Sequence, residues 1–203
     1  MVNIKERKRK MSTQGNEKQN YVFLAEGFEE IEALTVVDIL RRAGLNCRTV
    51  SIKKDGDLVV TGSHNIPVTA DISIDKITPD SIHSLILPGG MPGTSNLKAC
   101  EPLKALIQEA YRNKYHLAAI CAGPTVLAEL GLLKGVKAVC YPTSEEILAE
   151  AGAIVQRVET ITDGNITTSR GMGTAIAFSL ELVRIFQNEE AAADLQSKIV
   201  YRQ

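Results

Sequence analysis

The feature that most constrains this fold is a repeated pairing of a short apolar run with a longer segment carrying one apolar face. Three such pairs follow one another: 21–25 with 29–43, 85–87 with 102–114, and 116–120 with 126–132. A short run without polar alternation is typical of a strand buried on both faces, and the striped segments have helical spacing. The alternation therefore predicts an α/β fold with a parallel or mostly parallel sheet covered on both sides.

The remaining segments complete this pattern. We predict strands at 46–52, 136–140, 155–161 and 166–169, a helix at 144–151 capped by Ser144, and a closing helix at 171–186. Residues 58–60 and 66–68 flank Gly62-Ser63 and predict a small β-hairpin that interrupts the alternation. In parallel sheets, sites form beyond the carboxyl ends of the strands. Three predicted loops leave such ends: 25–32, 88–93 and 121–124.

Length and charge limit the domain count and the partners. A chain of 203 residues suits one domain, which we assign to residues 21–203. Residues 1–20 hold six Lys/Arg and two Glu without an apolar face, which predicts a disordered basic tail. A net charge of −1 gives no field that would gather nucleic acid or anionic lipid, and the apolar runs are too short to span a bilayer. We expect no nucleic-acid or membrane partner.

Cysteine and histidine usage points to a reducing compartment and a site without metal. The four cysteines form no CxxC pair and follow no secretory signal, so we expect reduced thiols and a cytoplasmic location. The three histidines lack metal-ligand spacing, and no glycine-rich phosphate motif occurs. We therefore expect neither metal nor cofactor.

Cys121 stands directly between the predicted strand 116–120 and the helix that follows. Such an elbow lifts the sulfur above the sheet and aims the free N–H groups of the helix toward it, which favours a thiolate. A helix terminus contributes only about 0.3–1 kcal/mol, so strong activation needs a second group. The alternative is a small buried hydrophobe, which is how we interpret Cys47, Cys100 and Cys140.

Glu32 and two backbone donors are candidates for that support. A protonated Glu32 donates a hydrogen bond to sulfur if burial raises its pKa, and the two titrations are then coupled. From the residues alone, a solvated helix start at Glu29, Glu30 and Glu32 is the better interpretation. The amides of the Gly89-Gly90 loop and of Ala122 form an oxyanion-type pocket or belong to ordinary turns.

Four segments resemble one known family. They are Ala25-Glu26-Gly27-Phe28-Glu29-Glu30-Ile31-Glu32, Leu87-Pro88-Gly89-Gly90, Ala118-Ala119-Ile120-Cys121-Ala122-Gly123-Pro124 and Thr168-Ser169-Arg170-Gly171. Together they resemble the ThiJ/PfpI superfamily, and most closely its DJ-one branch, the relatives of the parkinsonism-associated deglycase. The motifs stand in the family's order and span residues 21 to about 199.

The resemblance implies a flavodoxin-like three-layer sandwich that forms a homodimer. It implies Cys121 as an oxidisable nucleophile, Glu32 as its protonated hydrogen-bond partner, and Gly90 and Ala122 as amide donors. In that branch a basic side chain of the partner subunit approaches the site, and the matching position here holds His64. The alternative for His64 is a hairpin residue exposed to water.

Three differences from the patterns of related proteins reduce the range of activities expected for this chain. Protease-like members place histidine after the nucleophile, where this chain has Ala122, and amidotransferases need a late His-x-Glu pair, whereas no histidine follows His116. A histidine that the branch's animal members carry before a proline is replaced by Tyr141, which leaves its acid-base roles unassigned here.

Two hypotheses share every site residue. In the first, the protein is a deglycase or glutathione-independent glyoxalase: Cys121 attacks a reactive dicarbonyl such as methylglyoxal or its protein adduct, Glu32 shuttles a proton, and Gly90 and Ala122 hold the oxyanion. In the alternative, it is a non-enzymatic oxidative-stress sensor or holdase that acts through oxidation of Cys121. A thiazole- or thiamin-related role, suggested only by the superfamily name, ranks last.

Overall fold

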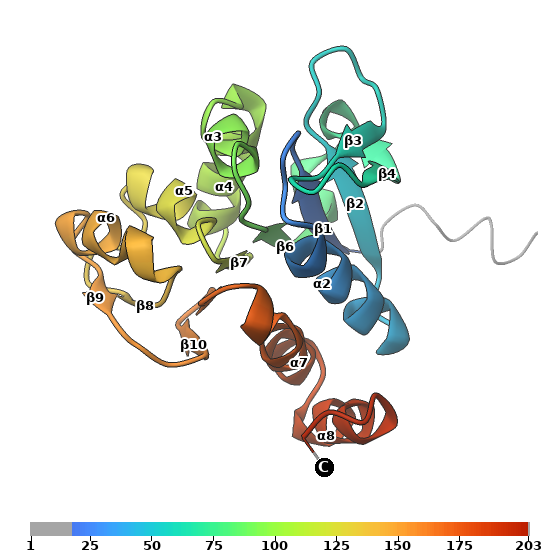
Figure 1. Cartoon of the computed structure of the whole chain (residues 1–203), viewed down its shortest axis with the longest axis vertical. Helices are drawn as coiled ribbons and strands as arrows, with labels where there is room; N and C mark the ends of the chain where they lie inside the picture. The colour runs from blue at the N-terminus through green and yellow to red at the C-terminus, as the bar shows by residue number, and fades with distance from the viewer. Residues whose placement is uncertain (1–17, 203) are drawn as a thin grey trace, which may run out of the picture.

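A seven-stranded sheet forms the centre of the computed structural model, which describes residues 18–202 (Figure 1). Its strands stand in the order β10-β11-β7-β6-β1-β2-β5, and every neighbouring pair is parallel except β10 with β11. The strands are β1 (Gln19–Leu24), β2 (Cys47–Ser51), β5 (Ile72–Ser73), β6 (Ile82–Leu87), β7 (His116–Ile120), β10 (Thr160–Asp163) and β11 (Ile166–Ser169). The predicted mostly parallel sheet is confirmed.

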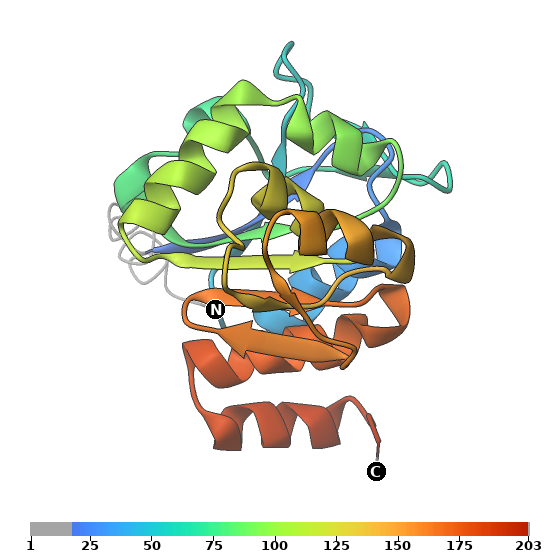
Figure 2. The same cartoon turned by 90° about the vertical axis from the view of Figure 1, so that its left-hand side faces the viewer.

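Helices cover both faces of the sheet, as the two views make plain (Figures 1 and 2). One face carries α2 (Glu30–Arg42), α7 (Ala175–Phe186) and α8 (Glu189–Lys198). The other carries α3 (Gly93–Lys98), α4 (Glu101–Arg112), α5 (Pro124–Glu129) and α6 (Glu145–Glu150). The chain therefore has the flavodoxin-like three-layer arrangement.

The alternation along β1 explains why both faces need helices. Tyr21 and Phe23 belong to the core shared with α4 and α5, whereas Val22 and Leu24 belong to the core shared with α2 and α7. Successive side chains of a strand point to opposite faces, so a run without polar residues must be buried twice. Each fully buried side chain of this size contributes about 1.5–3 kcal/mol to folding.

Two small sheets stand apart from the central one. The predicted hairpin is confirmed as β3 (Val59–Thr61) paired antiparallel with β4 (Pro67–Thr69). A second small sheet pairs β8 (Lys137–Ala138) in parallel with β9 (Ile154–Val155).

Several predicted boundaries are wrong in this second half of the chain. The strand expected at 136–140 shortens to β8, because the amide of Val139 donates to the Thr168 hydroxyl (2.9 Å) instead of continuing a ladder. The strand expected at 155–161 divides into β9 and β10. Ser144 precedes α6 but its side chain makes no capping hydrogen bond, because residues 142–144 already form a 3-10 turn. The closing helix begins at Ala175 after another such turn, and α3, α8 and β5 were not predicted.

The predicted basic tail lies outside the described residues as far as residue 17, and β1 begins at Gln19, inside the last residues of the predicted range. Between residues 18 and 202, no helix has the length and apolarity that crossing a bilayer requires.

The loops after β1 and β6 meet at one edge of the sheet. The amide of Glu29 donates to the carbonyl of Gly89 (3.0 Å), and the amide of Gly93 donates to the carbonyl of Gly27 (3.1 Å). Because parallel strands end at the same edge, the loop after β7 opens beside them. This edge is where the sequence predicts a site.

Candidate functional site

Cys121 occupies a strained elbow at the end of β7. Its φ of 64° lies in the left-handed region, which costs a non-glycine residue of order 1–3 kcal/mol. The surrounding chain holds the elbow from both sides: the Cys121 amide donates to the carbonyl of Ser169 (3.0 Å), and its carbonyl accepts from the amide of Tyr141 (2.8 Å). Strain retained in this way is typical of functional positions.

The sulfur of Cys121 faces two backbone donors. The N–H groups of Ala122 and Gly90 hydrogen-bond to it. These are the two amides that the sequence predicts as donors, and the structure brings them to the sulfur itself. Donors aimed at sulfur stabilise its charged form.

Glu32 lies beside this sulfur in the first turn of α2. Its side chain hydrogen-bonds to Cys121, and its carboxylate accepts from the amides of Gly89 (2.8 Å) and Met172. Glu32 is 1 % exposed, and Glu29 and Glu30 are also buried. The interpretation of these three residues as a solvated helix start is therefore wrong, because the loop after β6 and the β3–β4 hairpin cover this turn of α2.

The missing side chain of Gly89 makes this contact possible. A Cβ atom at Gly89 would stand 2.7 Å from Cys121 Cβ and 2.8 Å from Glu32 Oε2, both well inside van der Waals contact. Glycine lets the loop after β6 pass this close to both the thiol and the carboxyl group while its amide donates to Glu32. The glycine pair is thus part of the site.

Burial governs the protonation of the pair. It raises the pKa of Glu32 to about 7, against the hydrogen bonds from Cys121 and Gly89 that lower it. Burial, and then the charge of an ionised Glu32, raise the pKa of Cys121 to about 12. The expectation that the helix N-terminus favours a thiolate is therefore wrong while Glu32 is ionised, since the amides of Ala122 and Gly90 are outweighed.

The pair consequently shares one negative charge above neutral pH. In one form Glu32 is ionised and accepts a hydrogen bond from the Cys121 thiol. In the other, the proton sits on Glu32, which then donates to a thiolate that Ala122 and Gly90 also stabilise. One proton moving along one hydrogen bond interconverts the two forms, so the titrations belong to the pair.

The other three cysteines are confirmed as buried side chains. Cys47, Cys100 and Cys140 are all less than 9 % exposed, whereas Cys121 is partly exposed. Burial raises the pKa of Cys47 to about 12 and that of Cys140 to about 11. Greater exposure and a second backbone donor thus distinguish Cys121, since Cys100 has one such donor, the amide of Leu103.

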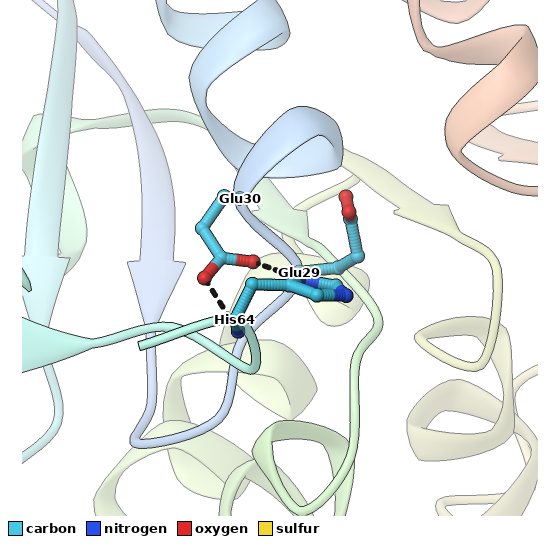
Figure 3. Close-up of side chains that lie close together, drawn as sticks. All are labelled: Glu29, Glu30 and His64. Atoms are coloured by element: carbon cyan, nitrogen blue, oxygen red, sulfur yellow. Dashed lines mark hydrogen bonds and ion pairs between the residues drawn. The ribbon is translucent and has the colours of Figure 1, made fainter. Parts of the chain in front are cut away.

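His64 contacts Glu30, a different carboxylate from the Glu32 that reaches the sulfur (Figure 3). Its amide donates to Glu30 Oε1 (2.7 Å) and its Nδ1 lies 2.8 Å from Glu30 Oε2, which folds the β3–β4 hairpin onto α2. The hydrogen bond with Glu30 raises the pKa of His64. Burial raises the pKa of Glu30, but the hydrogen bonds from His64 outweigh it and the net direction is down. The His64 side chain stays 68 % exposed and faces outward.

Glu29 joins Glu30 and His64 in a cluster of ligand-type side chains. The atoms able to bind a metal ion lie within 4.8 Å of one another. Glu29 accepts from the amide of Glu32 (2.7 Å) and thereby caps α2, while Glu30 accepts from His64. Hydrogen bonds within the chain account for these positions. Sequence spacing does not reveal the cluster because His64 lies 34 residues from Glu30.

Met172 also contributes to the site, although no sequence motif predicts it. Its amide reaches Glu32 because the loop after β11 leaves the same edge of the sheet as the other three. The motif at 168–171, which ends one residue earlier, is the signal that points to this loop.

Comparisons with a family model, with related sequences and with solved structures all match proteins of the same family. The family model described as the DJ-1/PfpI family matches residues 18–185. Protein DJ-1 homolog B of Arabidopsis thaliana is 37% identical over 181 residues, covering 88% of this chain and 40% of the relative. Protein dj-1beta of Drosophila melanogaster is 31% identical, covering 88% of this chain and 94% of the relative. The chain thus spans about two fifths of that plant relative's length.

Solved structures and archaeal relatives extend the comparison. Oxidized DJ-1 of Toxoplasma gondii matches with a TM-score of 0.86 at 31% identity, covering 92% of this chain and 100% of that chain. DJ-1beta of Drosophila melanogaster matches with a TM-score of 0.85 at 29% identity and the same two coverages. A protein named deglycase from Thermococcus kodakarensis is 28% identical, covering 82% of this chain and 98% of the relative.

Proposed function

Because the chain belongs to the DJ-1/PfpI family, we propose that it is a cysteine-dependent enzyme that removes reactive dicarbonyls such as methylglyoxal, or their adducts on proteins. The observation that carries this proposal is the Cys121 sulfur held against the buried carboxyl group of Glu32 and two backbone N–H groups. The three histidines are engaged elsewhere: His64 with Glu30, His83 with Asn20, and His116 with Thr167. Relatives named deglycase support the proposal.

The first step uses the form of the pair in which Glu32 holds the proton. The Cys121 thiolate attacks the aldehyde carbon of methylglyoxal, a carbon–sulfur bond forms, and the carbonyl electron pair moves to oxygen. Glu32 gives its proton to that oxygen, which yields a hemithioacetal. The amides of Gly90 and Ala122 lie at the sulfur and stabilise the oxygen while it is charged.

The following steps return the thiol. The Glu32 carboxylate removes the proton from the former aldehyde carbon, and its return to the neighbouring carbon converts the enediol to a lactoyl thioester. Water then hydrolyses the thioester to lactate and free Cys121. One carbon is oxidised as its neighbour is reduced, so no external oxidant is needed. With a protein adduct, the thiolate attacks the hemiaminal carbon and Glu32 gives its proton to the nitrogen, so that the carbon–nitrogen bond breaks, the amine leaves and the same hemithioacetal forms.

This function is tested by following methylglyoxal and lactate together. Reduced, metal-free protein is expected to consume methylglyoxal and form one lactate for each molecule lost, and prior alkylation of Cys121 is expected to abolish both. Absence of loss above the buffer rate, or loss that survives alkylation, contradicts the enzyme. If mild peroxide then oxidises Cys121 before Cys47, Cys100 and Cys140, as mass spectrometry resolves, the non-enzymatic sensor takes its place.

The proposal includes a homodimer built on α2. Ile31 is 49 % exposed in the first turn of that helix. A hollow of about 530 Å³ lies between α2, α7 and the end of α8, lined by Leu34, Thr35, Asp38, Ile39, Arg42, Ile176 and Ile199. Apolar positions left on a helix that already packs against the sheet suit a second copy. Sedimentation equilibrium is expected to give twice the chain mass. A monomer contradicts both the interface and a contribution of His64 to the partner's site.

A further inference from the structure

Three large, exposed and predominantly apolar side chains belong to loops whose backbone contacts Cys121 or Glu32. They are Met91 (63 % exposed), Tyr141 (48 %) and Met172 (56 %), which we call the apolar rim. Each of the three residues either stands next to a residue whose amide belongs to the site or contributes its own amide to the site. Met91 follows Gly90, whose amide reaches the sulfur. The amide of Tyr141 donates to the Cys121 carbonyl, and that of Met172 donates to Glu32.

The members of the apolar rim come from three separate loops. Met91 begins the turn into α3, and its sulfur lies 4.0 Å from the Ser95 hydroxyl. The Tyr141 ring lies over the turn before Met172, because a Cβ atom at Gly171 would stand 3.4 Å from the ring. Large apolar side chains left in water on loops that converge on one site are typical of a binding surface rather than of scattered surface residues.

We propose that the apolar rim makes the enzyme select 2-oxoaldehydes that carry an aryl or long alkyl group on the ketone carbon. The inference rests on the proposed function and names its substrate class. When Cys121 holds the aldehyde carbon, the substituent of the neighbouring carbon lies two bonds from the sulfur-bound atom and projects toward the mouth of the site. A methyl group covers little of the rim, whereas a phenyl group removes apolar area from water on both partners.

The test compares two substrates in matched variants. We measure kcat/KM for phenylglyoxal and for methylglyoxal in the wild type, Tyr141→Ala and Met172→Ser. Each variant is expected to lower the phenylglyoxal-to-methylglyoxal ratio about tenfold, the effect of losing one well-placed apolar contact. Tyr111→Ala is the control, because Tyr111 is also an exposed tyrosine (40 %) but lies near the C-terminal end of α4, at the opposite edge of the sheet.

The outcomes separate this inference from the function on which it rests. Cys121-dependent turnover with the same ratio in all four proteins overturns the apolar rim alone. Absence of turnover with both aldehydes overturns the proposed function. The rim is then measured by alkylation of Cys121 with N-phenylmaleimide and N-methylmaleimide, which share one reactive group. If the ratio of the N-phenylmaleimide rate to the N-methylmaleimide rate is the same in Tyr141→Ala, Met172→Ser and the wild type, the inference about the apolar rim is overturned.

Discussion

Replacing Cys121 by serine is expected to lower the rate of methylglyoxal loss at least about 10³-fold. A serine hydroxyl is far harder to ionise than a thiol, and Glu32 is the ionisable side chain that hydrogen-bonds to this position. Removal of the hydroxyl proton therefore has no imidazole base to drive it. The backbone donors Gly90 and Ala122 remain, so the residual rate measures what they contribute without the sulfur.

The chain offers a matched control for this substitution. Cys100→Ser makes the same chemical change at the N-cap of α4, a position at which serine is favoured. Its rate of methylglyoxal loss is expected to stay within about twofold of the wild type, since the change introduces a residue that suits an N-cap and lies outside the site. Equal rates for Cys121→Ser and wild type contradict the assignment of the nucleophile. If Cys100→Ser also loses most of its activity on methylglyoxal, the loss seen in Cys121→Ser is explained by general damage to the protein.

Replacing Glu32 by glutamine is expected to remove a pH-dependent loss of stability of about 3 kcal/mol between pH 4 and pH 8. The carboxyl group ionises near 4.5 in the unfolded chain and near 7 in the fold, because burial disfavours its charge. A raised pKa means that the fold favours the protonated form. The contribution of Glu32 to the free energy of unfolding is therefore full below pH 4.5 and is lost as the pH rises through 7. Glutamine does not titrate, so the variant lacks this change.

Urea unfolding at pH 4 and pH 8 measures this effect. The difference between the two free energies of unfolding is compared for wild type, Glu32→Gln and Glu150→Gln, the last making the same change at an exposed residue of α6. Thiolate absorbance against pH gives a second readout, because removing the neighbouring charge is expected to lower the pKa of Cys121 from about 12. Parallel pH dependence in wild type and Glu32→Gln contradicts the buried, protonated carboxyl group.

The elements that sequence predicts well are those whose pattern is local. Strands such as 116–120 are apolar on both faces, and α2 and α4 show a stripe at helical spacing, so their existence follows from the chain itself. The elbow at Cys121 follows because a strand and a helix leave it no room for a longer turn. Prediction failed where pairing is short: β8 and β9 have two residues each, and their ends depend on hydrogen bonds to distant side chains such as Thr168.

The layered sheet, the edge at which its loops meet and the cysteine placed on that edge thus follow from patterns within the chain. The surroundings of the sulfur depend instead on how distant segments pack. Glu32 is acidic and begins a helix, which locally favours solvent, yet the loop after β6 covers it and raises its pKa to about 7. That burial, like the contact of His64 with Glu30, depends on packing between segments far apart in the chain. Local propensity carries no information about such packing, because desolvation is set by whatever the rest of the fold places on top of a residue.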